Sequence, residues 1–280
     1  MQKHTEKAYA KLNLYLDITG RRADGYHDLK TVMQTVELYD ILDFELSEGT
    51  GIVLSCGRED VPCDDSNLVV KGILAVLSYA YFQPNCRISV DLTKNIPSQA
   101  GMGGGSADCA AAIRAMNALF HLGMSADEMR EVGAMCGADV PFLIEGGTAL
   151  CEGIGEKLTP LPKFDAVFAV VKPSDAISTP QAYKLFDEKG TPNAGDYGRF
   201  EQALPKGAEA VGGALYNAFT ETCGPDSVNA AIAKLKKYGA LGAEMTGSGS
   251  ACFGIFADEE TAKNAVEMCE MPFGGVYRTI

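Results

Sequence analysis

The 280-residue chain has no tryptophan, and it has no apolar run near the roughly 20 residues that a membrane-spanning helix requires. Its first nine residues are polar and carry both signs of charge, without the apolar stretch of a secretory signal. Positive charge is scarce, because 24 Lys and Arg face 37 Asp and Glu, which gives a formal net charge of −13. Such an acidic surface repels nucleic acid and anionic membranes, so we expect neither as a partner. A small polyanion is still allowed where one cleft concentrates positive groups.

Sequence signatures of metal and disulfide sites are also missing. The chain has nine cysteines, but no CxxC pair and no Cys/His cluster with the spacing of a zinc site. Most of the cysteines fall in apolar segments, as at positions 149–151 and 251–253. We therefore expect reduced, buried thiols in a cytoplasmic protein.

The usual phosphate-binding motifs are absent, yet one segment is very rich in glycine. There is no GxxxxGK[ST] P-loop, no Rossmann GxGxxG, and no HRD or DFG of the protein kinases. Four glycines lie at 101 and 103–105, and apolar residues then recur at helical spacing from Cys109 to Phe120. Glycine lets an anion approach the backbone N–H groups, and a helix N-terminus adds partial positive charge. The segment predicts a cradle for a triphosphate; the alternative is a flexible surface loop.

Hydrophobic patterning gives a coarse order of elements. Strands are expected at 8–18, at 31–46 with a break near Tyr39-Asp40, and at 87–92. Helices are expected over 66–82, after the glycine segment, and from a capping box at 125–128. Segments 142–144 and 148–151 are expected to form a hairpin. After Pro160 and Pro162 the pattern restarts with a strand at 166–171, helices near Gln181 and Asp226, and a strand around a second glycine cluster. We place the domain boundary there, which gives domains 1–159 and 160–280.

Three blocks stand in order along the chain: 10–14 (AKLNL), 97–106 (PSQAGMGGGS) and 246–249 (TGSG). This order resembles the superfamily of galactokinase, homoserine kinase, mevalonate kinase and phosphomevalonate kinase. Further strings at 18–27, 137–142 and 152–156 make the chain similar to the 4-diphosphocytidyl-2-C-methyl-D-erythritol kinases in particular. The resemblance runs from about Ala8 to Phe256.

The resemblance implies an α+β, two-domain small-molecule kinase fold. The N-terminal domain would be S5-like, the C-terminal domain an α/β-sandwich, and the active site would lie in the cleft between them. The reaction implied is transfer of phosphate from ATP, with Mg²⁺, to the 2-hydroxyl of a cytidine-bearing methylerythritol in the non-mevalonate route to isoprenoid precursors. Ala107 stands where the family usually has a second serine, so no hydroxyl contact is assigned there. Neither the protein ligands of magnesium nor the oligomeric state is indicated.

Two residues match the catalytic positions of that family. Asp139 is the candidate general base, because an aspartate is ordinarily ionised at neutral pH and accepts a hydroxyl proton; its alternative role is to cap the turn before Pro141. Lys11 shares one face of its strand with Asn13. The resemblance implies an ammonium beside Asp139 that keeps the carboxylate ionised and stabilises developing charge. The alternative is a solvated lysine.

The remaining site residues are assigned by the same resemblance. ATP binding falls to the glycine loop and two residues before it: Pro97, Ser98, Gln99, Ala100, Gly101, Met102, Gly103, Gly104, Gly105, Ser106 and Ala107, with Asn67 and Lys94 near the adenine. Substrate binding falls to Asn13, Tyr26, His27, Thr179 and Tyr183. We expect the pyrimidine to be clamped between the rings of Tyr26 and Tyr183, since aromatic rings stack well on bases. The alternatives are ordinary surface polar residues at 67 and 94, and tyrosines that only pack.

Two other functions stay open at this point. One is a different small-molecule kinase of the superfamily, against which the string Gly25-Tyr26-His27 argues. The other is a catalytically inactive nucleotide-binding regulator on the same fold, against which the presence of both Lys11 and Asp139 argues.

Overall fold

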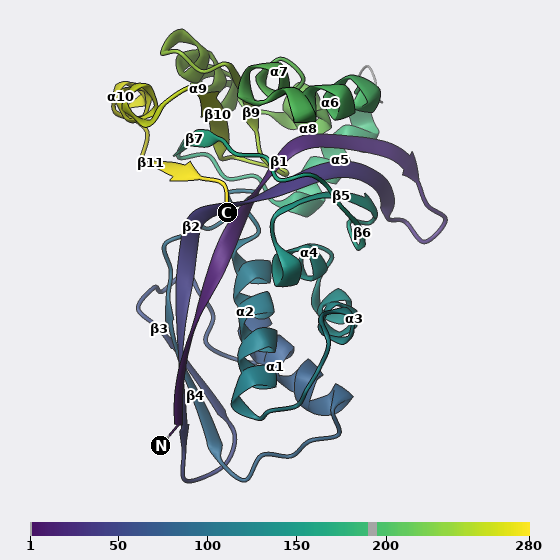
Figure 1. Ribbon diagram of the computed structural model, residues 1–280, viewed down its shortest axis with the longest axis vertical. Coiled ribbons are helices and arrows are strands. Elements are labelled where there is room, and N and C mark those ends of the chain that lie inside the picture. Colours follow the sequence, from purple (N-terminus) through teal and green to yellow (C-terminus); the bar gives the residue numbers. More distant parts are fainter. Residues whose placement is uncertain (1, 190–194) are drawn as a thin grey trace. The chain divides into compact units, whose positions relative to one another are not determined.

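The computed structural model describes residues 2–189 and 195–280 (Figure 1). The chain forms two compact units. The first unit comprises Met1–Ala10, Leu38–Ile96 and Gly103–Gly146, and the second comprises Lys11–Glu37, Pro97–Met102 and Gly147–Ile280. Strands β1 (Gln2–Arg21) and β2 (His27–Ser47) contribute residues to both. Each unit is described by itself.

The first unit is a sheet covered by helices on one face (Figure 1). Strand β3 (Ile52–Cys56) runs parallel to β4 (Arg87–Thr93), and β4 runs antiparallel to the second half of β2. The helices are α1 (Leu68–Tyr79), α2 (Gly104–Leu119), α3 (Ala126–Cys136) and α4 (Val140–Glu145). Helix α2 is the central one, because small alanines let it lie deep in the core, where residues 109–113 are fully buried.

The helix caps explain where these helices begin. Asn67 caps α1, and Ser125 forms a complete capping box with Glu128 at the start of α3, as predicted. Helix α2 begins inside the glycine run itself, after Gly103 in the left-handed conformation with φ of 72°. A residue with a side chain is strained there, so the sequence needs glycine at this position.

Two predicted features of the first half of the chain are wrong. Segment 142–144 is not a strand, because Val140–Glu145 forms helix α4 with Pro141 in its first turn, where proline is favourable. Strand β2 does not break near Tyr39-Asp40 either. Asp40 stays within the strand as a fully buried carboxylate that accepts hydrogen bonds from the backbone N–H groups of Asn95 and Ile96.

The second unit contains the second half of β1, the first half of β2 and a separate four-stranded sheet. Strand β5 (Thr148–Gly153) pairs with β2 and with β6 (Lys157–Pro160), and the two-residue strand β8 (Tyr216–Asn217) runs parallel to β1. The separate sheet is antiparallel, in the order β11 (Phe273–Arg278), β7 (Val167–Lys172), β10 (Cys252–Phe256), β9 (Gly242–Met245).

Helices complete the second unit. They are α5 (Thr179–Lys189), α6 (Tyr197–Ala203), α7 (Ala208–Gly212), α8 (Ala218–Cys223), α9 (Asp226–Lys237) and α10 (Glu259–Cys269), with a 3-10 turn at Leu204–Lys206. Residues of α5, α8, α9 and α10 share one apolar core with the four-stranded sheet. The predicted helices near Gln181 and Asp226 are confirmed as α5 and α9.

The compact units do not coincide with the predicted division at Pro160, which stays a prediction. Residues 147–159 belong to the second unit, because β5 pairs with residues 29–34 of β2. Among the described residues, no helix has both the length and the apolar character needed to cross a membrane.

Candidate active site

In the first unit, the glycine run supplies backbone donors that have no partner inside helix α2. Helix α2 has no side-chain cap, and its first intrahelical hydrogen bond runs from Ala107 N to Gly103 O at 2.8 Å. The N–H groups at the start of an α-helix have no partner inside the helix. No acidic residue lies in this first turn, so the positive end of the helix is not neutralised there. The geometry suits an anion such as a phosphate group.

The Lys94 ammonium lies next to the N-terminus of α2. Its ammonium donates to Asp40 and, at 2.6 Å, to Asp108 Oδ2, and a Cβ on Gly104 would be 3.4 Å from Lys94 Nζ. Burial alone lowers the pKa of Lys94, but the attraction of Asp108 and Asp40 outweighs it and raises that pKa. Burial raises the pKa of Asp108 as well, and its Oδ1 is buried without a hydrogen-bond partner among the described residues. Lys94 is therefore no ordinary surface lysine; its predicted contact with adenine stays a prediction.

Asn67 is engaged within the protein. Its Oδ1 accepts from Val69 N at 2.8 Å and its Nδ2 donates to Pro62 O at 2.6 Å, and the residue is buried. The side chain thus fixes the start of α1. Its predicted role near the adenine is untested by these contacts.

Asp139 stands at the turn between α3 and α4. Its backbone carbonyl accepts from Leu143 N at 3.1 Å, but its side chain forms no cap on α4. The alternative role, a cap of the turn before Pro141, is not tested by this contact, and the role as a base stays a prediction. A Cβ on Gly137 would be 3.8 Å from Ser106 Oγ, so the turn that carries Asp139 lies against the first turn of α2. The candidate base and the candidate phosphate cradle belong to the same unit.

In the second unit, the two glycine-rich segments lie side by side. Ser250 N donates to Gln99 O at 3.3 Å and Ala251 N to Ala100 O at 3.2 Å. Gly101 has φ of 72°, and a Cβ there would lie 2.1 Å from Thr246 O. Only glycine permits this close approach. The segment 246–251 thus braces the part of the glycine loop that precedes Gly103.

Lys11 is held at the start of a buried polar network in the second unit. Its Nζ donates to Asn13 Oδ1 at 2.5 Å, and Asn13 Nδ2 donates to Thr31 Oγ1 at 2.9 Å. Thr31 Oγ1 in turn donates to the carbonyl of Tyr15 at 2.6 Å, and Thr246 Oγ1 accepts from Asn13 N at 3.0 Å. Lys11 is only 4% exposed, so the alternative of a solvated lysine is wrong. Asn13 orients Lys11, and its contact with substrate stays a prediction.

The predicted substrate residues of the second unit form a second group of contacts. The His27 ring stacks on Tyr183, with centroids 4.8 Å apart and 16° between planes, and His27 Nε2 lies 2.8 Å from Asp187 Oδ1. Thr179 Oγ1 is 3.1 Å from Ser248 Oγ, which ties α5 to the second glycine segment. The partner stacked on Tyr183 is thus His27, whereas Tyr26 points outward with 62% of its surface exposed.

Several residues of these networks were not predicted from the sequence. Thr246 and Ser248 belong to the second glycine string, so their positions were visible but not their partners. Thr31 and Asp187 carried no signal: one is a polar residue on an alternating strand, the other a charge on an amphipathic helix.

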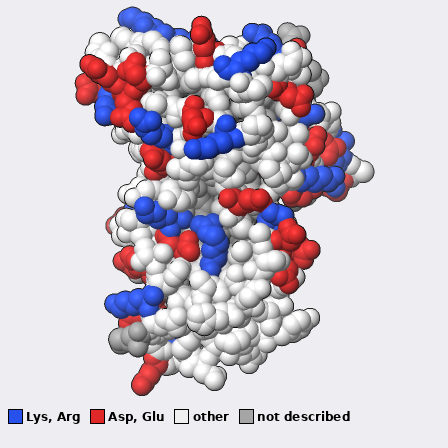
Figure 2. Space-filling view, viewed as in Figure 1, with Lys and Arg blue, Asp and Glu red and all other residues white. Residues whose placement is uncertain are grey.

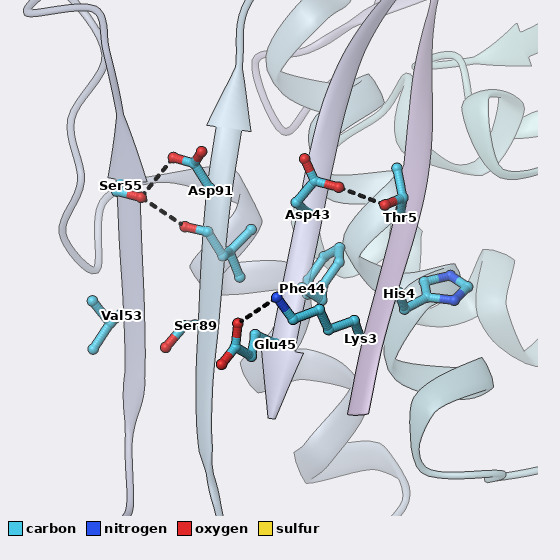
Figure 3. Close-up of a pocket in the computed structure, with 11 residues that line it drawn as sticks. Lys3, His4, Thr5, Asp43, Phe44, Glu45, Val53, Ser55, Ser89 and Asp91 are labelled. Carbon is cyan, nitrogen blue, oxygen red and sulfur yellow. Dashed lines mark hydrogen bonds and ion pairs between the residues drawn. The ribbon is translucent and has the colours of Figure 1, made fainter. Parts of the chain in front are cut away.

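A pocket elsewhere on the first unit carries none of the predicted residues. It has a volume of about 390 Å³ and lies on the sheet face formed by β1 to β4 (Figure 3). Six of its polar side chains pair with one another, as Thr5–Asp43, Ser55–Asp91 and Lys3–Glu45. On the face shown in Figure 2, Lys and Arg are interspersed with Asp and Glu rather than gathered into one basic patch.

Comparison with known proteins places the chain in a family. Residues 67–147 match the model of the GHMP kinases N terminal domain, and residues 189–271 match the model of the GHMP kinases C terminal. The chain belongs to the GHMP kinase family. This confirms the predicted superfamily, the α+β kinase fold and an enzyme that uses ATP.

Individual relatives of this GHMP kinase agree on one activity. It is 41% identical over 279 residues to a 4-diphosphocytidyl-2-C-methyl-D-erythritol kinase of Clostridium perfringens, with 98% of this chain and 96% of the relative covered. It is 42% identical over 261 residues to the enzyme of that name from Desulfitobacterium hafniense, with 91% and 88% covered.

Solved structures extend the likeness to the fold. A crystal structure of 4-(cytidine 5'-diphospho)-2C-methyl-D-erythritol kinase superposes with a TM-score of 0.83 at 28% identity, covering 99% of each chain. A homoserine kinase from Cytophaga hutchinsonii superposes with a TM-score of 0.78 at 18% identity, covering 100% of this chain and 95% of its own. The second likeness shows the fold alone.

Proposed function

We propose that this GHMP kinase transfers the γ-phosphate of ATP to the 2-hydroxyl of 4-diphosphocytidyl-2-C-methyl-D-erythritol, a step of the non-mevalonate route to isoprenoid precursors. The observation that carries the proposal is identity of about 40% along nearly the whole chain to enzymes of that name. The proposal places the enzyme in the cytoplasm.

The roles of the residues follow from their chemistry. Asp139 accepts the proton of the attacking hydroxyl, and the N–H groups at the start of α2 hold phosphate oxygens of ATP. Lys11, with its orientation fixed by Asn13, supplies a positive charge where negative charge develops. Phosphoryl transfer requires little more than such positioning and charge stabilisation.

We include Mg²⁺ as the ion that accompanies ATP. Among the described side chains, no three His, Cys, Asp or Glu converge into a metal cluster. Mg²⁺ commonly takes most of its ligands from substrate phosphates and water. We therefore assign no protein ligand to the metal.

The substrate is tested by a panel of alcohols. The enzyme is incubated with ATP, Mg²⁺ and, in separate reactions, the cytidine-bearing methylerythritol, methylerythritol phosphate, mevalonate or homoserine, and ADP release is followed. We expect turnover with the first alcohol only. Faster turnover of mevalonate or homoserine would identify a different kinase of this family, and no turnover of any alcohol would favour the inactive regulator.

Tyr26 is expected to stack on the cytosine base. Its backbone is fixed in a turn by Arg22 and Asp24, which leaves the exposed ring available. Stacking on an aromatic ring is worth about 1–3 kcal/mol per base, so Tyr26→Ala should raise KM for the cytidine substrate by roughly 10-fold or more, with KM for ATP nearly unchanged. The control is Tyr81→Ala, another exposed tyrosine. An unchanged KM in Tyr26→Ala would contradict the stacking.

Gly105 tests the phosphate cradle with little risk to the fold. A Cβ there meets only the flexible Leu68 side chain, at 3.4 Å. Gly105→Val crowds the first-turn N–H groups of α2, so we expect the dissociation constant for ATP to rise by about 10-fold or more, which corresponds to about 1.4 kcal/mol. Gly57→Val, at a glycine with no neighbour within 4 Å, is the control. Calorimetric ATP affinity equal to that of the unmodified enzyme, in a folded Gly105→Val protein, would count against the cradle.

A further inference from the structure

Asn217 is a buried residue of the second unit whose side-chain amide is fully engaged within the protein. It is 1% exposed and lies at the end of β8, directly before α8. Its Oδ1 accepts a hydrogen bond from Phe219 N at 3.0 Å and so caps α8. Its Nδ2 donates to Met245 O at 2.8 Å and to Gly247 O at 2.9 Å, which uses both hydrogens of the amide nitrogen.

The two carbonyls that Asn217 binds flank Thr246, and we call this pair of hydrogen bonds the amide clamp. The clamped residues also lie against the glycine loop, because a Cβ on Gly247 would be 2.7 Å from Gly101 O. Thr246 is fully buried, and its backbone N–H donates to Ala251 O at 3.0 Å. One amide bound to both flanking carbonyls fixes the backbone on each side of Thr246, and therefore the direction of its side chain.

The Thr246 hydroxyl joins the amide clamp to the network that holds Lys11. Its Oγ1 accepts from Asn13 N at 3.0 Å and lies 3.2 Å from Asn13 Oδ1. That same Oδ1 accepts from Lys11 Nζ at 2.5 Å. Strand β8 runs parallel to β1 with Asn217 opposite Leu16, so the clamp is attached to the strand that carries the lysine. One hydroxyl thus contacts both the backbone and the side chain of the residue that orients Lys11.

We propose that Asn217 is a positioning residue for the transfer reaction. The amide clamp holds the Thr246 hydroxyl against Asn13, and Asn13 in turn keeps the Lys11 ammonium in place. The inference rests on the proposed function, which gives Lys11 its role in the reaction. Because Asn217 is buried and bonded within the protein, its effect on turnover passes through the residues that it holds.

The simpler role for Asn217 is a cap of α8 alone, and one substitution separates the two roles. Aspartate is as good a helix N-cap as asparagine, so Asn217→Asp keeps the acceptor for Phe219 N. A carboxylate donates to neither Met245 O nor Gly247 O, and a protonated carboxyl donates to only one of them. The variant therefore breaks the clamp and spares the cap.

The first measurement needs no substrate. Amide hydrogen exchange at Asn13 is followed by NMR in the folded full chain, relative to the amides of β10, which report opening of the second unit as a whole. We expect exchange at Asn13 to be about 10-fold faster or more in Asn217→Asp, the effect of losing one hydrogen bond. The matched control is Asn117→Asp, since Asn117 also binds backbone, through Met124 O at 3.0 Å and Met124 N at 2.9 Å. Exchange at Asn13 equal to wild type in folded Asn217→Asp would overturn the proposal.

The second measurement is steady-state turnover of the cytidine substrate. A catalytic group displaced by about 1 Å can cost about 10²-fold in rate, so we expect kcat to fall by roughly 10–10²-fold in Asn217→Asp, with KM changed far less. In a Lys11→Met background the same substitution should lower kcat little further, because the clamp acts through that ammonium. An unchanged kcat in Asn217→Asp, or a full additional loss in the double variant, would overturn the positioning role.

Thr246 keeps the test decisive if Asn217→Asp does not fold. Thr246→Val removes only the hydroxyl that the clamp places, and it should give the same faster exchange at Asn13 and the same fall in kcat. Thr246→Ser should recover most of both, and normal values in Thr246→Val would contradict the inference. Absence of turnover in wild type would overturn the proposed function and the kinetic part together. The exchange measurement would still decide whether the clamp exists, so the two failures are distinguishable.

Discussion

Replacing Asp139 with asparagine should lower kcat by roughly 10²–10⁴-fold, the usual range for loss of a general base. The amide keeps the size of the carboxylate but accepts no proton at neutral pH. Because asparagine has nearly the shape of aspartate, the fold should tolerate the change. Substrate KM should change far less than kcat, since the lost interaction belongs to the transition state.

The measurement is steady-state kinetics on the purified variant, with its thermal midpoint recorded beside wild type. Asp127→Asn is a matched control, because Asp127 is an exposed aspartate in the first turn of α3. A folded Asp139→Asn enzyme that keeps more than half of the wild-type kcat would rule out the base.

Lys11→Met should lower kcat by about 10²–10³-fold, the cost of removing one preorganised donor from a developing charge. Methionine retains most of the length and apolar stem of lysine, so burial is preserved while the charge is lost. The variant also leaves Asn13 Oδ1 without its hydrogen bond from Lys11, although Thr246 Oγ1 still lies 3.2 Å away.

A graded series around Lys11 separates charge from orientation. Thr31→Val removes the group that fixes the Asn13 amide and should reduce kcat by less than Lys11→Met does, while Thr31→Ser restores the hydroxyl and most of the activity. Exposed Lys3 is the control for removal of a lysine from the same strand. Near-normal kcat in Lys11→Met would assign the residue a structural role only.

Much of the fold was readable from local patterns. Alternating leucines from Leu12 to Leu16 predicted the core of β1, and the capping box at Ser125 predicted the start of α3. The burial of Lys11 and Asn13 was not readable, because alternation predicts one buried face and here both faces of β1 are covered.

The errors have physical reasons. Three apolar residues at 142–144 fit a strand or a buried helix equally well. The neighbouring Pro141 lies in the first turn of α4, a position that favours the helix. Asp40 looked like a strand breaker, but a buried carboxylate is tolerated where Lys94 pairs with it. That pairing is 54 residues away in sequence and leaves no local trace.

The candidate site was found in part. The glycine loop and its helix were predicted from composition and periodicity, whereas Lys11, Asp139 and the substrate residues came from family resemblance. The stacking of His27 on Tyr183 and its bond to Asp187 could not have been predicted, since α5 is about 160 residues from His27 and only folding brings them together.

The most direct test of the central claim is the ³¹P spectrum of the product formed from ATP and the cytidine-bearing methylerythritol. Carbon 2 of a 2-C-methylerythritol carries a methyl group and no hydrogen, so a phosphate on its oxygen has no proton three bonds away. Our account predicts one new phosphate monoester signal without three-bond proton coupling, beside an intact cytidine diphosphate. A proton-coupled doublet or triplet would place the phosphate on another hydroxyl. If no new signal appears while intact ATP is present, the proposed reaction is contradicted.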